Sequence, residues 1–116
     1  MVRGHVLHRC CNRLGRHALS QRIDVNGYWT ILVCYGADLD EVNSGFTATD
    51  YSKRLSVVAI SLTDSKAQLM NTISHEVKHV QSNICEYYGV AEDSENAAYL
   101  TGYITMRMYQ VFRKFL

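Results

Sequence analysis

The stretch from Lys66 to Tyr88, KAQLMNTISHEVKHVQSNICEYY, decides the fold because it carries the clearest helical pattern in the chain. Its apolar side chains recur at steps of three and four residues and form one stripe: Leu69, Ile73, Val77, Val80, Ile84 and Tyr88. Asp64 or Ser65 can cap the start of this segment, and Gly89 tolerates the left-handed conformation that ends a helix. The sequence therefore predicts a helix over residues 66–88.

Patterned segments on both sides of this helix predict the rest of a small α+β domain. Residues 28–35 and 55–62 are apolar and β-branched runs that favour strands, and the Asp, Asn and Gly of residues 24–27 favour a turn. Asp93 or Ser94 can cap a second, C-terminal helix from about residue 95 to residue 112. We therefore expect an α+β fold in which helices pack on a small sheet.

Two further segments carry weaker patterns. Residues 6–22 place apolar side chains at helical spacing among arginines, which predicts an amphipathic helix. Residues 36–50 are rich in Asp, Asn, Gly, Ser and Thr without a sustained period, which predicts a loop or a short irregular helix.

Length and composition indicate one globular domain over residues 1–116. The chain has 116 residues, 47% of them hydrophobic and 20% charged, which suits a single core. No apolar run is long enough to cross a bilayer, and residues 1–15 lack the apolar centre of a secretory signal. The four cysteines are irregularly spaced, so we expect reduced thiols and a cytoplasmic location.

The overall charge gives no reason to expect a nucleic-acid partner. The formal net charge is only +1 at pH 7. The first segment is nevertheless basic, through Arg3, Arg9, Arg13, Arg16 and Arg22. One hypothesis for the function is therefore a basic adaptor that binds nucleic acid, and it predicts that binding depends steeply on salt concentration.

The segment His75-Glu76-Val77-Lys78-His79 matches the H-E-x-x-H pattern and lies inside the best helix. Residues four apart project from one face of a helix, so the imidazoles of His75 and His79 can reach one Zn²⁺ ion. Glu76 flanks the ion, where a carboxylate can take a proton from zinc-bound water as general base.

A catalytic zinc usually has three protein ligands, so a third must come from elsewhere in the chain. Glu95 is the favoured candidate because it begins the second helix after a short connection. Glu92 and Asp93, in the preceding loop, are its competitors.

The sequence places H-E-x-x-H in one helix and a glutamate at the start of the next. This order resembles the gluzincin branch of zinc metallopeptidases. Residues 71–103 are similar to small zincin-like proteins that bacteriophages and mobile elements encode. The resemblance implies a minimal zincin-like domain, zinc ligation by His75, His79 and Glu95, and Glu76 as the base. For a phage-encoded chain it also implies a location in the host cytoplasm or the virion.

The chain departs from the larger gluzincins one turn after Glu95. Those enzymes carry an acidic residue there that orients a metal-binding histidine, and this chain has Tyr99. Tyr99 and Tyr103 are therefore candidates for orienting a ligand or for stabilising an oxyanion, and Tyr87 and Tyr88 are further oxyanion candidates. By analogy with zincins, the strand over 55–62 is the edge strand that pairs with an extended peptide.

The sequence therefore predicts a zinc-dependent metallohydrolase, a peptidase acting on a peptide or protein substrate. The alternative is a non-catalytic module in which zinc stabilises a structural or interaction domain. Glu76 discriminates between the two hypotheses because a structural zinc site needs no general base.

Overall fold

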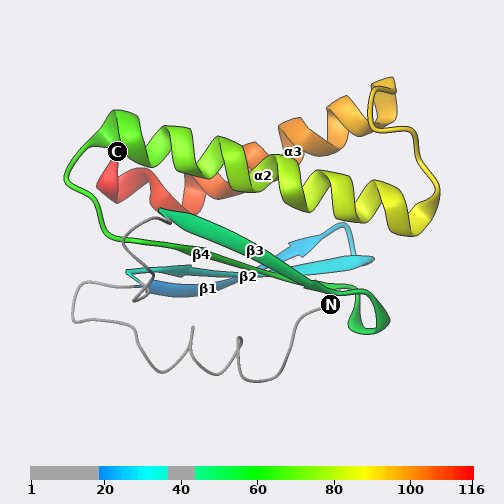
Figure 1. The fold of residues 1–116 in the computed structure, drawn as a ribbon, viewed down its shortest axis with the longest axis horizontal. Helices are drawn as coiled ribbons and strands as arrows, with labels where there is room; N and C mark the ends of the chain where they lie inside the picture. The colour runs from blue at the N-terminus through cyan, green and yellow to red at the C-terminus, as the bar shows by residue number, and fades with distance from the viewer. Residues whose placement is uncertain (1–18, 37–43) are drawn as a thin grey trace. The chain divides into compact units, whose positions relative to one another are not determined.

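A computed structural model describes residues 19–36 and 44–116 of the chain. They form a four-stranded mixed sheet and two long helices, α2 and α3, which confirms the predicted α+β class (Figure 1). The chain divides into two compact units, Met1–Asp64 with the sheet and Ser65–Leu116 with the helices. Whether both units share one domain, with the helices packed on the sheet, stays a prediction.

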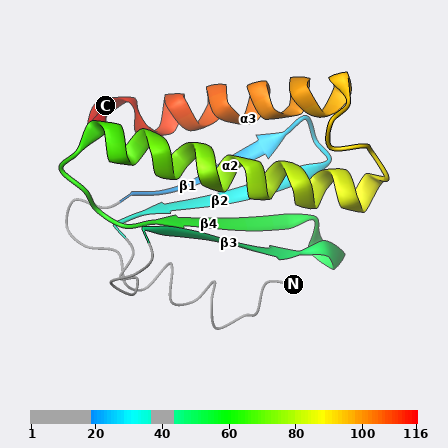
Figure 2. The same cartoon turned by 45° about the horizontal axis from the view of Figure 1, so that its top comes forward.

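The sheet has the strand order β1-β2-β4-β3 (Figure 2). Its strands are β1 (Leu19–Val25), β2 (Trp29–Tyr35), β3 (Gly45–Asp50) and β4 (Leu55–Ile60). β1 and β2 pair antiparallel, β2 and β4 pair parallel, and β3 pairs antiparallel with β4. The predicted strands over 28–35 and 55–62 correspond to β2 and β4, the central strands of the sheet.

A tight turn joins β1 to β2, as the sequence predicts. Asn26 and Gly27 both have positive φ, 52° and 82°, and the Tyr28 backbone N–H donates to the Val25 carbonyl at 3.1 Å, so the chain reverses over the three residues between Val25 and its partner Trp29. The Asp24 carboxylate accepts a hydrogen bond from the Gly27 backbone N–H at 3.1 Å. The helix predicted over 6–22 is wrong for residues 19–22, which belong to β1, because the turn pairs them with β2; residues 6–18 lie outside the described part.

The loop predicted over 36–50 is wrong at its end, because residues 45–50 form β3; residues 37–43 lie outside the described part. β3 pairs with β4 from Gly45 opposite Ile60 to Asp50 opposite Leu55. β4 is therefore hydrogen-bonded on both sides, and the expectation that it is an edge strand is wrong. In the described sheet the edge strands are β1 and β3.

Packing and buried hydrogen bonds tie the strands of the sheet together. A fully buried apolar cluster consists of Cys34, Val57 and Ala59. The partly buried Leu32, Phe46 and Ala48 pack against this cluster. The Trp29 indole N–H donates to the Ser56 hydroxyl at 3.0 Å. The Ser56 hydroxyl also lies 2.8 Å from that of Thr49, so one buried chain of hydrogen bonds links β2, β4 and β3.

The cysteines correct one expectation. Cys34 is disulfide-bonded, so the prediction of reduced thiols is wrong for this residue. Cys85 is a free, buried cysteine. Because disulfides persist in oxidising compartments, the cysteines no longer argue for a cytoplasmic location.

Helices α2 (Lys66–Tyr88) and α3 (Glu95–Phe112) match the predicted bounds, and they contact each other in antiparallel directions (Figures 1 and 2). Ser65 caps α2 by accepting from the Gln68 backbone N–H, and Gly89 ends it with φ of 68°. Ser94 caps α3. Neither helix of the described chain is both long and apolar enough to span a membrane.

Candidate metal centre

His75 and His79 lie on the exposed side of α2, one helical turn apart. Their Nε2 atoms face each other at 3.2 Å. The two rings are 4.9 Å apart between centroids and inclined by 69°. The i, i+4 spacing of the sequence therefore brings both imidazoles to one point above the helix surface, as predicted.

The separation of the two nitrogens suits a shared zinc ion. Two nitrogens at about 2.05 Å from zinc, at the tetrahedral angle, are about 3.3 Å apart. The observed 3.2 Å requires almost no movement of either ring. Without a metal, an N–H of one ring donating to the other accounts for the same distance, because a neutral imidazole has one donor and one acceptor nitrogen. The donor pair therefore fits zinc for two of its ligands.

Glu76 follows His75 in the chain but lies on a different side of α2. At 100° per residue it lies about 100° from His75 and about 60° from His79. Its side chain is only 3% exposed, whereas both histidines are exposed. In the described residues no buried side-chain oxygen or nitrogen lacks a hydrogen-bond partner, so the Glu76 carboxylate is held in place. Glu76 thus lies at the border between the buried face and the face with the histidines.

Glu95 is the first residue of α3, as predicted, and its side chain is exposed. It lies about 160° around the helix from the buried Ala97. Residues 19–36 and 44–116 contain no group of three or more His, Cys, Asp or Glu side chains that could hold a metal ion. The structure therefore brings His75 and His79 together without Glu95, and the ligand role of Glu95 stays a prediction.

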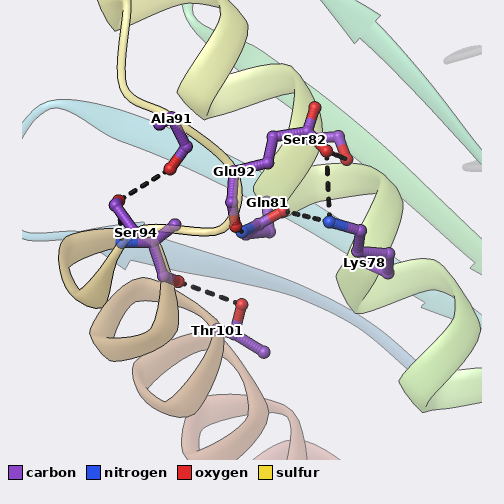
Figure 3. Close-up of polar contacts among 8 residues, drawn as sticks. Lys78, Gln81, Ser82, Ala91, Glu92, Ser94 and Thr101 are labelled. Carbon is purple, nitrogen blue, oxygen red and sulfur yellow. Dashed lines mark hydrogen bonds and ion pairs between the residues drawn. The ribbon is translucent and has the colours of Figure 1, made fainter.

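Glu92, a competitor for the third ligand position, takes part in another network (Figure 3). Its carboxylate accepts from the Lys78 ammonium at 3.2 Å and from the Ser82 hydroxyl at 3.1 Å. The Gln81 side-chain amide donates to the Glu92 backbone carbonyl at 3.1 Å, and Lys78 also donates to the Gln81 amide oxygen at 3.0 Å. These contacts bind the loop between the helices to the side of α2.

The hydrogen bond from Lys78, followed by that from Ser82, lowers the pKa of Glu92 below its usual value. The loop then continues to Ser94, whose hydroxyl donates to the Ala91 carbonyl at 2.6 Å and accepts from the Ala97 backbone N–H at 3.2 Å. The network therefore fixes where α3 begins, and with it the backbone of Glu95.

Sequence reasoning missed this network, although it contains the Lys78 of the H-E-x-x-H segment. A signal is visible in retrospect, because Lys78 and Ser82 are four residues apart on one helix face and an acidic loop follows Gly89. The spacing does not reveal which acidic residue folds back, since that depends on the path of the loop.

The tyrosine candidates lie in different surroundings. Tyr99 is 71% exposed, the largest exposed fraction among the large hydrophobic side chains of the described residues. The Tyr103 hydroxyl accepts a hydrogen bond from the Arg107 guanidinium at 3.0 Å, and that guanidinium also lies over the Tyr103 ring. Tyr87 and Tyr88 pack edge to face at the end of α2. None of these contacts reaches His75 or His79.

Cys85, six residues after His79 on α2, is an unsuitable metal ligand as it stands. Burial raises the pKa of its thiol, and the negative charge of Glu92 adds to this effect. A raised pKa disfavours the thiolate that binds metal. The candidate centre thus consists of the two imidazoles, with Glu76 beside them.

Comparisons of the chain with family models, with curated proteins and with solved structures found no match.

Proposed function

We propose that the chain is a zinc-dependent metallohydrolase, a peptidase, in which His75 and His79 hold the metal and Glu76 is the general base. The observation that carries the proposal is the 3.2 Å separation of the two imidazole nitrogens on the exposed side of α2. The adjacent buried carboxylate distinguishes this pair from an ordinary pair of surface histidines.

Glu95 is proposed as the third protein ligand. It opens α3, and the contacts of Glu92 with Lys78 and Ser82 hold the preceding loop against α2. The remaining requirement is that the Glu95 side chain turns toward the imidazoles from a backbone whose position is already set. Glu92 is less suited to this role because its carboxylate is already engaged.

His75, His79 and Glu95 would hold the zinc ion, which would supply a bound water of lowered pKa, near 7, and a positive charge that polarises the amide carbonyl. Glu76 takes the proton from the attacking water and delivers it to the nitrogen of the leaving amine. Glu76 is only 3% exposed, which limits the access of bulk water to its carboxylate. Tyr99 and Tyr103 remain the proposed candidates for orienting a ligand or stabilising the oxyanion.

The second candidate is a zinc-stabilised structural or interaction module without catalysis. The observation that favours it is that Glu76 is only 3% exposed and its buried carboxylate has a hydrogen-bond partner, as a residue with a purely structural role would. In such a module the metal would fix α2 against a neighbouring element, and Glu76 would only contribute to packing and hydrogen bonding.

The test combines metal content with hydrolysis of a mixed peptide library. Wild type, Glu76→Gln, His79→Ala and Glu95→Gln are purified and equilibrated with zinc. We expect about one zinc per chain in wild type and Glu76→Gln, at least tenfold weaker binding in His79→Ala and Glu95→Gln, and turnover only in wild type.

The outcomes separate the two candidates. Zinc binding without turnover in wild type would support the structural module. Turnover in Glu76→Gln would remove the base assignment. Unchanged zinc affinity in Glu95→Gln would remove Glu95 from the ligand set but leave the histidine pair, and unchanged affinity in His79→Ala would overturn the site itself.

A further inference from the structure

The exposed side of α3 carries an ordered stripe of side chains. Its members follow one another at alternating steps of four and three residues, and all are exposed: Glu95, Tyr99, Gly102, Met106 and Tyr109 of α3, and Arg113 directly after it. At 100° per residue they fall within an arc of about 80°. The centre of the stripe is apolar, with Tyr99 71%, Met106 48% and Tyr109 56% exposed. Alternating four- and three-residue steps are the spacing at which one helix packs along another.

The stripe is complementary to itself when one copy is reversed. The numbers of its members are symmetrical about Ile104, so an antiparallel copy centred there places Tyr99 opposite Tyr109 of the other copy. Gly102 then faces Met106, a small residue opposite a long one. A Cβ added at position 102 would meet nothing within 4 Å in the single chain, so the space beside Gly102 is open. An unbranched methionine of the other copy can occupy this space.

The charges at the two ends of α3 agree with the same arrangement. The beginning of the helix is acidic, with Asp93 and Glu95, and its end is basic, with Arg113 and Lys114. Antiparallel pairing brings each acidic end to a basic end, and it also aligns the helix dipoles favourably. Glu95 faces Arg113 of the other copy in this arrangement, so dimerisation and zinc ligation by Glu95 are alternative states of this side chain.

We infer that the exposed side of α3 is a docking surface for a second copy of this chain, which pairs antiparallel about Ile104. A C2 dimer needs a surface that is complementary to itself, and this stripe meets that condition in spacing and charge. A parallel pair would place the two Arg113 side chains against each other, which is repulsive, and it would place the two Gly102 residues opposite each other without a side chain to fill the space between them. An exposed aromatic stripe on a charged helix is typical of an interaction surface.

Two helices of this length bury an area at the small end of specific interfaces, so the dimer should be weak, with a Kd of roughly 10–100 µM. Sedimentation equilibrium of the full chain over a wide concentration range measures this Kd. The buffer contains a chelator, so that the result does not depend on the proposed zinc site.

Paired charge variants test the register. Tyr99→Glu alone and Tyr109→Lys alone each place two unpartnered charges in the dimer interface, one from each copy, and each should raise the Kd at least tenfold. The double variant should return the Kd to within a few-fold of wild type, because each new carboxylate then faces a new ammonium of the other copy. Tyr87→Glu is the matched control, since Tyr87 is 44% exposed but lies on α2 outside the stripe.

Circular dichroism establishes that each variant retains its helices. A wild-type chain that stays monomeric up to roughly 1 mM would overturn the proposal, as would single variants that dimerise like wild type. A double variant that remains as weak as the single ones would also overturn it, because that result rejects the antiparallel register.

Discussion

The residues of the candidate centre are positioned in two different ways, His75 and His79 by the spacing of one helix and Glu95 by the loop between two helices. The facing imidazoles of His75 and His79 follow from helical spacing alone, which is why the sequence predicts them. The position of Glu95 depends instead on the path of the loop, which Lys78 and Glu92 fix by a contact across fourteen residues. No periodicity in the sequence encodes such a contact.

The Glu92 carboxylate should contribute to stability in a manner that depends on pH. Its pKa in the folded chain lies below the ordinary 4.5, chiefly because Lys78 and then Ser82 donate hydrogen bonds to it. A carboxyl whose folded pKa is lowered stabilises the native state above its unfolded pKa, and this stabilisation is lost as the pH falls through the folded pKa. Glu92→Gln should therefore lower the melting temperature at pH 7, by about 1–3 °C because the pair is half-exposed.

The difference between wild type and Glu92→Gln should shrink as the pH falls below about 4.5 and vanish well below it. Asp93→Asn, at the adjacent exposed acid outside this network, serves as the control. Thermal melts followed by circular dichroism from pH 7 to pH 3 measure both variants. A difference that grew on acidification would show that the ion pair does not act as described.

At the scale of elements, sequence reasoning succeeded where the pattern is local and failed where pairing decides. Both helices have the expected bounds because their apolar periods end at residues suited to capping, Ser65 and Ser94 at the starts and Gly89 after α2. The Thr-rich sequence of residues 45–50 predicts a loop, and only pairing with β4 makes it the strand β3. The sequence of residues 19–22 likewise predicts a helix, and pairing with β2 makes these residues part of β1.

The interior position of β4 likewise depends on β3, so no pattern within residues 55–62 reveals it. The consequence bears on function. A peptide that adds to the described sheet by backbone hydrogen bonding must use β1 or β3, because both sides of β4 are already occupied.

The start of α3 offers a test of how local capping supports the candidate centre. The Ser94 hydroxyl both caps α3, at the Ala97 backbone N–H, and donates to the Ala91 carbonyl in the loop. Ser94→Ala removes both contacts and should cost about 1 kcal/mol of folding free energy. Ser94→Asp keeps an acceptor for the cap but loses the donor to Ala91, so it should retain most of the stability.

Urea unfolding of the two variants measures these free energies, and zinc titration shows their effect on the site. If the cap positions Glu95, Ser94→Ala should weaken zinc binding more than Ser94→Asp does. Ser65→Ala, which removes the equivalent cap of α2 far from the loop, is the matched control. Equal zinc affinity in all three variants would separate the start of α3 from the metal site.

In the whole molecule, zinc binding in one compact unit can change the thermal stability of that unit alone or of both units. Both histidines, Glu76 and Glu95 belong to the unit Ser65–Leu116, whereas the sheet belongs to the other unit. Zinc that binds only the native state stabilises it by about 2.7 kcal/mol when its free concentration is a hundred times its Kd. For a chain of this size the melting temperature should then rise by roughly 10 °C.

Calorimetry with and without zinc therefore tests both the metal site and the single-domain prediction. If residues 1–116 unfold as one domain, wild type shows one transition, and zinc raises all of it. Glu76→Gln should respond like wild type because its ligands are intact, while His79→Ala should respond little. Two transitions, of which zinc raises only one, would mean that the helical unit folds independently of the sheet. The single-domain prediction would then be wrong even though the histidine pair binds zinc, because stabilisation by a ligand spreads only as far as the cooperative unit that contains its site.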